Sequence, residues 1–279
     1  MRKKSLSNTI LFLLLSVLGV LFVTPIFFVG MNSFKGRFFI SDRPFAFPKG
    51  ELFAGLENYI NGVERAEFFS AFGWSTFITV FSVLIIILCT SMAAWYITRV
   101  KTKSTELLYF AFVFSMVVPF QMIMFTMSKL ADSLNLNNPL GMLVLYLGFG
   151  AGLSVFMFCG FVKGIPLEIE EAALMDGGSP VKTYFRIVLP ILKPTAITVA
   201  ILNAMWIWND YLLPYLVIGV GTPYKTIPVA VQYLMGSYGA KDYGALMALL
   251  VLSVIPIVVF YLFCQKYIIE GVVAGAVKG

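Results

Sequence analysis

Six apolar stretches, each long enough to cross a lipid bilayer as a helix, dominate this chain of 279 residues. A helix needs about 20 mostly apolar residues to span the hydrocarbon core. Because lipid offers no partners for backbone polar groups, stretches of this kind are expected to be helical. The sequence therefore predicts an all-α membrane protein with six transmembrane helices, at Thr9–Gly30, Phe72–Tyr96, Leu107–Lys129, Leu140–Val162, Thr195–Gly219 and Tyr243–Lys266.

The composition supports the same class. Hydrophobic residues make up 59% of the chain and charged residues 12%, whereas soluble domains are about 45–50% apolar and about 25% charged. The absence of histidine excludes histidine-based acid–base chemistry, Ser-His-Asp triads and the commonest zinc ligand sets. Cys89, Cys159 and Cys264 lie in separate apolar spans without metal-site spacing. We therefore expect no metal and no catalytic residue.

Basic residues set the expected orientation, because cytoplasmic loops of membrane proteins are enriched in Lys and Arg. The short loop Arg99–Lys103 is basic, and Arg2-Lys3-Lys4 precede the first span. That span is longer than the apolar part of a signal peptide and lacks a small-residue cleavage site, so we expect it to be retained. Both termini and the polar segment at 163–194 are then expected in the cytoplasm.

The segment at 163–194 predicts two short helices around a glycine break rather than a span or a flexible loop. Pro166 suits the start of a helix, and the acids that follow it suit the positive end of the helix dipole. Gly177-Gly178 can end that helix, and Ser179-Pro180 can cap and begin the next. Leu174 and Met175 are apolar groups that a solvated helix does not need, so this helix is expected to contact a partner.

The residues Glu171-Ala172-Ala173-x-x-Asp176-Gly177, followed by Phe185, Ile187 and Leu189-Pro190, resemble the EAA signature of ABC-transporter permease subunits. Family members more often have Ala where this chain has Gly178. The resemblance implies the type I ABC importer permease fold, with a cytoplasmic coupling helix that sits in a groove of a partner ATPase. The residues that it assigns to ATPase coupling are Glu171, Ala172, Ala173, Leu174, Asp176, Gly177, Phe185, Leu189 and Pro190.

Further matches cover about Asn58 to Gly279 and are similar to the carbohydrate-type, maltose-permease branch of this family. They include Ala93-Ala94-Trp95-Tyr96 with Arg99, Pro119, Trp208-Asn209-Asp210-Tyr211 and the closing Gly275–Gly279. The branch implies that the tail Gly271–Gly279 reaches into the ATPase dimer and that the outer loop Gly219–Asp242 contacts a solute-binding protein. The candidate contact residues in that loop are Tyr224, Lys225, Gln232 and Tyr238.

Polar residues inside the spans are candidates for the translocation path. Asp210 lies about 22 Å along the fifth span, at 1.5 Å per residue, and therefore in the outer part of the bilayer. Ionisable groups at such depth usually face a cavity or the bundle interior. Solute contact and a structural Asn-Asp cap beside an interfacial Trp belt are both open interpretations. The candidate residues are Gln121, Asn203, Trp208, Asn209 and Asp210.

Three regions are expected along the chain. Residues 1–71 hold the first span and an outer loop, in which Phe53–Phe72 is expected to lie on the membrane as an amphipathic helix. Residues 72–266 form the permease core of five spans with the EAA loop at 163–194, and residues 267–279 form a cytoplasmic tail. Small residues at Gly148, Gly152, Gly160 and Gly164 predict close helix packing along the fourth span.

No phosphate-binding loop for ATP is present, since the nearest match has Tyr224 where its second glycine belongs. We therefore predict a non-catalytic subunit without a cofactor of its own, with ATP and magnesium bound by a partner ATPase. The predicted function is half of the pore of an ATP-driven importer for a sugar or sugar-like solute in a bacterial inner or plasma membrane. Its expected partners are a second permease, an ATPase dimer, an extracytoplasmic solute-binding protein and lipid, with no nucleic acid.

Two alternatives remain. An ion-gradient-driven secondary transporter predicts inverted repeats, broken helices and buried acids at mid-membrane; apart from Asp210 the spans hold no acid, and no repeat is found. A scaffolding membrane subunit would not need the interruptions at Pro119 and Pro214 or the outer loops. Mono- and oligosaccharides, polyols and glycerol-phosphate-like solutes all fit the proposed branch.

Overall fold

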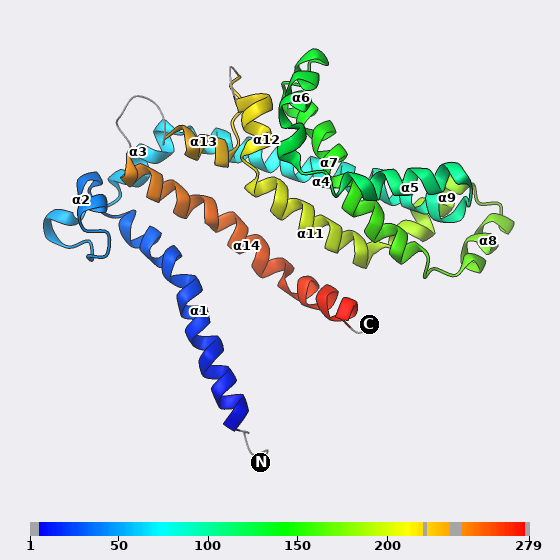
Figure 1. The fold of residues 1–279 in the computed structure, drawn as a ribbon, viewed down its shortest axis with the longest axis horizontal. Helices are drawn as coiled ribbons and strands as arrows, with labels where there is room; N and C mark the ends of the chain where they lie inside the picture. The colour runs from blue at the N-terminus through cyan, green and yellow to red at the C-terminus, as the bar shows by residue number, and fades with distance from the viewer. Residues whose placement is uncertain (1–5, 220–221, 235–241, 277–279) are drawn as a thin grey trace. The chain divides into compact units, whose positions relative to one another are not determined.

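The computed structural model describes residues 6–219, 222–234 and 242–276, with side chains within residues 8–267 of those ranges. In these ranges the regular elements are helices, besides one isolated bridge between Lys35 and Phe53 (Figure 1). The predicted all-α class is thereby confirmed. The chain divides into two compact units, Met1–Phe69 with Ala230–Val258, and Ser70–Val229 with Val259–Gly279. The predicted regional boundaries at residues 71 and 266 stay a prediction.

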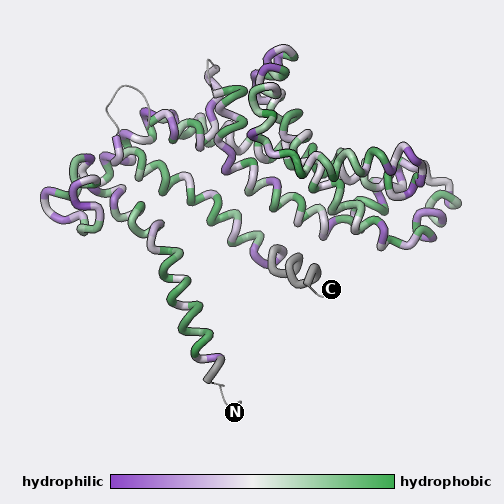
Figure 2. Tube along the Cα trace, viewed as in Figure 1, coloured by the Kyte–Doolittle hydropathy of each residue, from purple (hydrophilic) through white to green (hydrophobic). Residues whose placement is uncertain are grey.

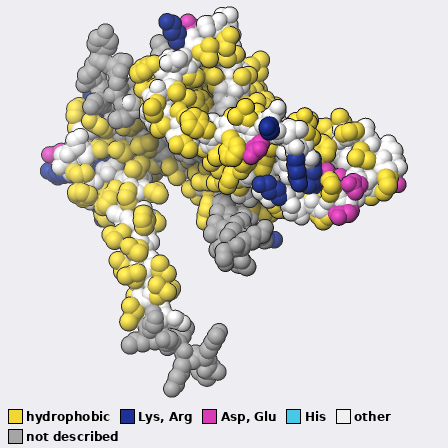
Figure 3. Space-filling model, turned by 45° about the vertical axis from the view of Figure 1, so that its right-hand side comes forward, with side chains coloured by type: hydrophobic (Ala, Val, Ile, Leu, Met, Phe, Trp, Pro, Cys, Tyr) yellow, Lys and Arg dark blue, Asp and Glu magenta, His cyan; other side chains and the backbone are white. Residues whose placement is uncertain are grey.

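Among the described residues, four helices are long and apolar enough to cross a membrane, and up to six spans result if each of two bent helix pairs counts as one. The straight candidates are Asn8–Asn32, Phe68–Arg99, Pro139–Val162 and Tyr243–Tyr267. Their apolar character is continuous along the chain trace in Figure 2, and hydrophobic side chains cover much of the face drawn in Figure 3. These helices bear out the predicted multi-span membrane fold, whereas the third and fifth spans differ from the continuous helices that we expected.

The third predicted span, Leu107–Lys129, is a bent pair. Helix α5 (Lys103–Ser115) and helix α6 (Phe120–Ser133) meet at an angle of 107°. Pro119 lies at the junction with an extended backbone, φ −63° and ψ 135°. Proline has no N–H for the helical ladder and disfavours helix at the preceding residue, which explains why one straight helix does not form.

The fifth predicted span, Thr195–Gly219, is interrupted as well. Helix α11 (Lys193–Asn209) ends at Asp210, whose ψ of 122° is extended, and helix α12 (Leu212–Pro214) and the π-helical segment Tyr215–Gly219 follow. The break thus comes before Pro214, the residue that we expected to loosen the helix. Its cause is the Asp210 carboxylate, because Oδ1 accepts a hydrogen bond from the Leu212 N–H at 3.0 Å and so starts a new turn.

The first unit contains helix α1 (Leu6–Asn32), helix α2 (Arg37–Asp42), the 3₁₀ turn η1 (Gly50–Leu52), helix α3 (Glu57–Arg65), the end of helix α13 (Ile227–Tyr233) and the start of helix α14 (Tyr243–Ala276). Asn58 fastens α3 to the segment after α1, because its Nδ2 donates to the backbone oxygens of Ser33 at 2.8 Å and Lys35 at 2.7 Å. The amphipathic helix expected at Phe53–Phe72 is shorter than predicted, since the backbone turns at Glu67 with φ +48°.

Lys35 is a buried cation within this unit. Its Nζ donates to the backbone oxygens of Arg43 at 2.9 Å and Pro44 at 3.1 Å, and burial lowers the pKa of the Lys35 ammonium group. Because carbonyl oxygens take the place of water around the charge, the loop between α1 and α4 has a structure of its own. This agrees with its length, which exceeds that of ordinary connections.

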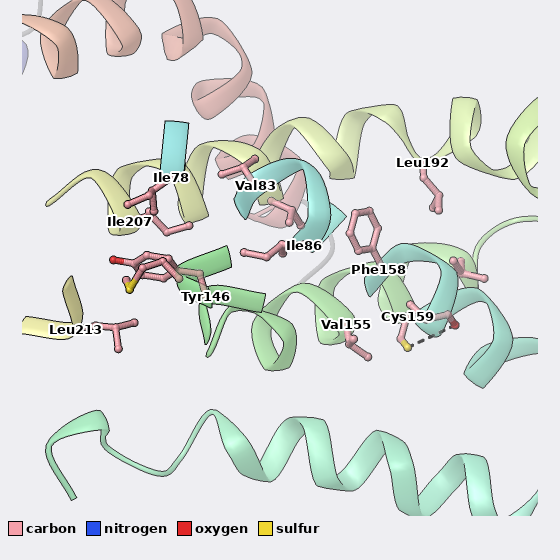
Figure 4. Packing of buried hydrophobic residues seen from close by; sticks show 14 of the residues in the cluster. Ile78, Val83, Ile86, Tyr146, Val155, Phe158, Cys159, Leu192, Ile207 and Leu213 are labelled. Atoms are coloured by element: carbon pink, nitrogen blue, oxygen red, sulfur yellow. Dashed lines mark hydrogen bonds between the residues drawn. The ribbon is translucent and has the colours of Figure 1, made fainter. Parts of the chain in front are cut away.

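The core of the second unit lies among helix α4 (Phe68–Arg99), α5, helix α7 (Pro139–Val162) and α11 (Figure 4). Asn138 caps α7 by accepting from the Gly141 N–H at 2.9 Å, with Pro139 at the first helical position. The fully buried residues that Figure 4 labels come from several of these helices and include Ile86, Tyr146, Val155, Phe158 and Leu192. This core holds the end of α4 in place against the helices that carry the candidate site.

Close helix packing along α7 is confirmed at only one of the predicted glycines that it contains. A Cβ atom on Gly152 would lie 2.7 Å from Ser115 Oγ and 2.8 Å from the backbone oxygen of Phe112, both in α5. A Cβ atom on Gly148 or Gly160 would meet nothing within 4 Å among the described residues. Within the chain, Gly152 is therefore the residue that allows α5 and α7 to approach.

We predict that Gly152→Ala destabilises the chain whereas Gly160→Ala does not. The added methyl group at residue 152 has to displace backbone of α5, and overpacking of this kind costs about 1–3 kcal/mol. The midpoint of thermal unfolding of the purified chain in mild detergent measures the difference. Equal midpoints for the two variants would contradict the close approach at Gly152.

Candidate functional site

Helix α8 (Leu167–Met175) is the first arm of the predicted helix–turn–helix, and it ends as the sequence indicates. Gly177 has φ +79°, the left-handed conformation that favours glycine. The Gly178 N–H donates to the Ala173 oxygen at 3.0 Å, and the Gly177 N–H donates to the Leu174 oxygen at 3.1 Å. These two bonds are those of a Schellman motif, so the last carbonyl groups of α8 are satisfied by its own turn.

Gly178 has less free space around its Cα atom than Gly177 has. A Cβ atom there would lie 2.6 Å from the Ala173 backbone oxygen. Alanine, which related sequences were expected to carry more often at this place, would therefore force the turn to shift. The glycine pair consequently fixes the shape of this break as well as its position.

The second arm begins at Ser179, whose Oγ accepts from the Lys182 N–H at 3.3 Å, as the sequence predicts for a cap. Helix α9 (Pro180–Thr183), the π-helical segment η2 (Tyr184–Val188) and helix α10 (Leu189–Ile191) follow it toward α11. Pro190 has no N–H to donate to the preceding turn. Figure 1 shows α8 and α9 at the end of the second unit that lies away from α6 and α12.

A buried ion pair joins α8 to α4. Glu170 is only 4% exposed, and its Oε1 lies 2.6 Å from Arg99 NH2 and 3.0 Å from Arg99 Nε. Arg99 NH2 also donates to the Ile165 oxygen at 2.9 Å, in the turn that leads into α8. The Trp95 indole donates to Glu170 Oε2 at 2.9 Å, so both carboxylate oxygens are satisfied.

Side chains on one face of α4 contact both arms of the helix–turn–helix. Ser91, Trp95 and Arg99 recur every four residues and therefore lie on the same side of the helix. Arg99 and Trp95 hold Glu170 of the first arm, while Ser91 Oγ lies 2.6 Å from the hydroxyl of Tyr184 in the second arm. The Trp95 and Tyr184 rings also contact each other, with centroids 5.5 Å apart. The end of α4 is thus in direct contact with both arms of the helix–turn–helix.

The helix–turn–helix also presents an exposed, partly apolar surface next to this ion pair. Met175 is 84% exposed, and Leu167, Leu174 and Phe185 are each close to half exposed. Glu171, Ala172, Asp176, Gly177 and Pro190, which the EAA resemblance assigns to coupling, are exposed too, and Ala173 and Leu189 are half-buried. On the face drawn in Figure 3, the right-hand part carries both acidic and basic side chains among apolar groups, and further charged groups lie at the left and at the top. Such a surface has the chemistry of a protein contact.

A groove of about 450 Å³ lies where α8 meets the end of α4. It is lined mainly by apolar groups of Trp95, Leu167, Leu174 and Pro180, and the Glu170 carboxylate closes it on one side. Because the groove continues the exposed face of α8, the two form one concave surface on the second unit.

The residues predicted for the translocation path do not come together as one polar surface. Asn203 is buried between helices, where its Nδ2 donates to Ser154 Oγ at 3.2 Å and to the Val199 oxygen at 2.9 Å. Asn209 and Gln121 are exposed, and the Trp208 ring packs edge-on against Phe72, with centroids 5.9 Å apart. Their proposed role in solute passage stays a prediction.

Asp210 has partners that explain it structurally. Its Oδ2 accepts from the hydroxyl of the fully buried Tyr146 at 3.0 Å, while its Oδ1 starts α12 through Leu212. Of the two interpretations that the sequence leaves open, this geometry favours the structural cap. The carboxylate joins α7 to the break that follows α11.

The predicted outer contact residues fall in different environments. Tyr224 packs edge-on against Trp74, with ring centroids 4.9 Å apart, and Lys225 is half-buried. Gln232 is exposed, and Tyr238 lies outside the described residues. No group of three or more metal-ligating side chains lies together in the ranges that the structure describes.

Several helices long and apolar enough to cross a membrane, together with an exposed helix–turn–helix, define the class of a multi-pass helical membrane protein. The chain belongs to the family of binding-protein-dependent transport system inner membrane components, whose pattern matches residues 86–273. Members of this family are non-catalytic membrane subunits of ABC importers. A bacterial multi-pass membrane protein is the class to which these findings assign the chain.

Relatives match it over essentially their whole length. The chain is 39% identical over 279 residues, 100% of both sequences, to the probable starch degradation products transport system permease protein AmyC of Thermoanaerobacterium thermosulfurigenes. It is 35% identical over 271 residues, 96% of each, to the multiple sugar-binding transport system permease protein MsmG of Streptococcus mutans. The resemblance to carbohydrate-type permeases is thereby confirmed.

The fold also matches a solved structure, that of a bacterial ABC transporter involved in the import of the acidic polysaccharide alginate. The TM-score is 0.77 at 20% sequence identity, and the match covers 96% of this chain and 98% of the other. The predicted type I permease fold is confirmed by this likeness.

From sequence, Glu171 was assigned to ATPase coupling, and Glu170 was not singled out. The two acids are alike in sequence, and only the phase of α8 against α4 turns Glu170 inward. A signal was present in Arg99 and Trp95, which were noted for their resemblance to the family but not paired with an acid. Arg99 is the basic residue that ends a long apolar helix, where an inward carboxylate is the natural partner.

We predict that Arg99→Met and Glu170→Met each destabilise the chain by about 3–5 kcal/mol, because each leaves one buried charge without its partner. The double variant should lose less than the sum of the two, since it leaves no unpaired charge. Thermal unfolding in mild detergent measures all three. Glu168→Met is the matched control, since Glu168 is an exposed acid on the same turn. Additive losses would show that Arg99 and Glu170 are not coupled.

A second prediction separates the two interpretations of Asp210. Asp210→Asn keeps an acceptor for the Leu212 N–H and a polar partner for Tyr146, so stability and transport should stay close to wild type. Asp210→Ala removes the cap and leaves the Tyr146 hydroxyl unpaired, at a cost of about 1–3 kcal/mol. Uptake assays alongside thermal unfolding test this. Loss of uptake by Asp210→Asn at unchanged stability would instead support direct contact with the solute.

Proposed function

We propose that this chain forms half of the translocation pore of an ATP-driven importer for a sugar or sugar-like solute. In this proposal α8 seats on a cytoplasmic ATPase dimer, a second permease completes the pore, and an extracytoplasmic binding protein delivers the solute. The observation that carries the proposal is the exposed apolar surface of α8 beside a buried ion pair that joins α8 to α4. Such a helix is suited to receive force from a partner protein and to transmit it to the helices of the bundle.

The proposed mechanism follows from the contacts of α4. Closure of the ATPase dimer would move α8. The two hydrogen bonds from Arg99 to Glu170 would then transmit that movement directly to α4. Tyr184, held by Ser91, would move the second arm in step. Because α4 contributes Ile78, Val83 and Ile86 to the core, its tilt would reorganise the bundle between two states of access, as in other two-state transitions.

The substrate class rests on the relatives. AmyC is named for starch degradation products and MsmG for multiple sugars. We infer that this chain serves an importer of sugars or sugar oligomers. ATP and magnesium belong in this proposal to the partner ATPase, and both termini of the chain lie on the cytoplasmic side with α8. The C-terminal residues 277–279, to which we assign part of the reach into the ATPase, lie outside the described residues.

Uptake by proteoliposomes tests this function. The complete complex, purified with its second permease and ATPase, should import a radiolabelled maltooligosaccharide or related sugar when ATP is inside and the liganded binding protein is outside. Ionophores that collapse proton and sodium gradients should leave the rate unchanged. Uptake that follows an ion gradient and ignores ATP would support the secondary-transporter alternative instead.

We predict that Glu171→Arg lowers binding-protein-stimulated ATP hydrolysis and uptake together, at least tenfold, without affecting membrane insertion. Glu171 is exposed on α8, beside the apolar face assigned to the ATPase, and a reversed charge there would oppose docking. Glu64→Arg is the control, since it reverses an exposed acid on α3, far from α8 in sequence. Wild-type stimulation and uptake in Glu171→Arg would overturn the assignment of α8.

A further inference from the structure

A second cavity, of about 470 Å³, lies on the other side of the α4 end. The end of α4, the start of α5 and the end of α7 line it, so it lies where two long apolar helices, α4 and α7, end and α5 begins. Its lining differs from that of the groove beside α8 because it contains three lysines, Lys101, Lys103 and Lys163. Such a place in a membrane protein is the boundary between hydrocarbon and headgroups.

The three ammonium groups face little opposite charge. Glu106 is the one acid in the lining, which leaves the cavity with a net positive charge. Within the described ranges, none of the three lysines forms an ion pair. The Thr102 hydroxyl, which accepts from the Thr105 N–H, can also donate a hydrogen bond to a guest. The cavity therefore offers cations and a hydroxyl group to an anion.

Two local features shape the cavity for such a guest. The Lys163 Nζ lies 5.7 Å from the centroid of the Tyr109 ring, a cation–π contact that keeps this lysine over α5. Thr102 and Thr105 form a capping box at the start of α5, so the turn that carries Lys101 and Lys103 is ordered. The N-terminus of α5 is the positive end of its helix dipole. It lies at the cavity and adds to the positive charge of the lysines.

An apolar track runs from the cavity along α5. Lys103, Leu107, Phe110 and Phe114 recur at intervals of three or four residues and so form one stripe of the helix. Leu107 is 71% exposed and Phe114 is 69% exposed. A small free anion has no use for such a track, whereas the acyl chains of a lipid would cover it. The stripe thus continues a basic cavity with a surface suited to hydrocarbon.

We propose that this cavity binds the phosphate headgroup of an anionic phospholipid, with its acyl chains along the exposed stripe of α5. The lysines neutralise the phosphate, the Thr102 hydroxyl donates to one of its oxygens, and the apolar stripe replaces contacts within the bilayer. Basic pockets of this kind between transmembrane helices are known places for acidic headgroups. The site adds a lipid ligand to the chain and does not depend on how the ATPase is coupled.

Binding by the delipidated full-length chain in mild detergent tests this proposal. Native mass spectrometry would compare dioctanoyl phosphatidylglycerol with dioctanoyl phosphatidylcholine, and thermal unfolding would add inorganic phosphate as a third probe. We expect the half-saturating concentration of phosphatidylglycerol to be at least tenfold lower than that of phosphatidylcholine. Retention and stabilisation by phosphatidylglycerol should weaken as salt is added. Equal stabilisation by inorganic phosphate would show a free-anion site and overturn the lipid assignment.

Variants locate the site. The triple variant Lys101→Gln, Lys103→Gln, Lys163→Gln should bind phosphatidylglycerol at least tenfold more weakly. Its matched control, Lys182→Gln, Arg186→Gln, Lys193→Gln, removes the same charge at exposed residues outside the cavity and should bind as the wild type does. Equal weakening in both triple variants would mean a general surface effect and reject the cavity.

The single variant Lys163→Gln keeps the test decisive if the triple variant does not fold. It removes one exposed ammonium group and should weaken binding about fivefold, the factor expected for one lysine near an anionic headgroup. Unchanged binding by this variant, with phosphatidylglycerol still preferred, would place the lipid elsewhere on the chain.

Discussion

Burial of the Glu170 carboxylate is the constraint that organises the end of the second unit. A charge that is 4% exposed can remain there only if it is paired and hydrogen-bonded, and Arg99 and Trp95 supply both. Since these two side chains lie on α4 and the carboxylate lies on α8, the requirement fixes the angle and register of α8 against α4. The Schellman turn at Gly177 then directs the second arm back to Tyr184, which α4 also holds. Burial of the Glu170 carboxylate, with the contacts that it requires, thus fixes the position of both arms of the helix–turn–helix against α4.

Two of the predicted spans are interrupted. Such breaks would allow movement in a transporter, but each break has a free-energy cost in lipid. Pro119 bends the third span by 107°, and Asp210 ends α11 before the fifth span is complete. Each break frees backbone groups, which have to find partners within the protein. At Asp210 the carboxylate takes the Leu212 N–H and the Tyr146 hydroxyl in compensation. The breaks are therefore built junctions between rigid segments, in keeping with a transporter whose helices tilt as bodies.

Local sequence predicted the features that a few neighbouring residues determine. The positive φ at Gly177, the cap at Ser179 and most of the span positions follow from glycine chemistry, capping preference and hydropathy. What sequence did not predict depends on the relative phase of distant helices. Glu170 and Glu171 are equivalent until α4 is placed beside α8, and Gly152 differs from Gly160 only because α5 crosses there. Asp210 could be a cap or a solute contact until Tyr146, 64 residues earlier, was found to donate to it.

The end of α4 connects two surfaces of opposite character. Its residues Trp95 and Arg99 line the apolar groove beside α8, and its residues Ile97 and Thr98, with Lys101 just beyond its end, line the basic cavity. An α-helix exposes adjacent residues on different faces, so a segment of seven residues can serve both. A lipid headgroup held in the basic cavity would resist movement of the same segment that Glu170 couples to α8. Any force that α8 receives has to move α4 against that anchor, so the lipid would add to the work of switching and bias the chain toward one of its two states.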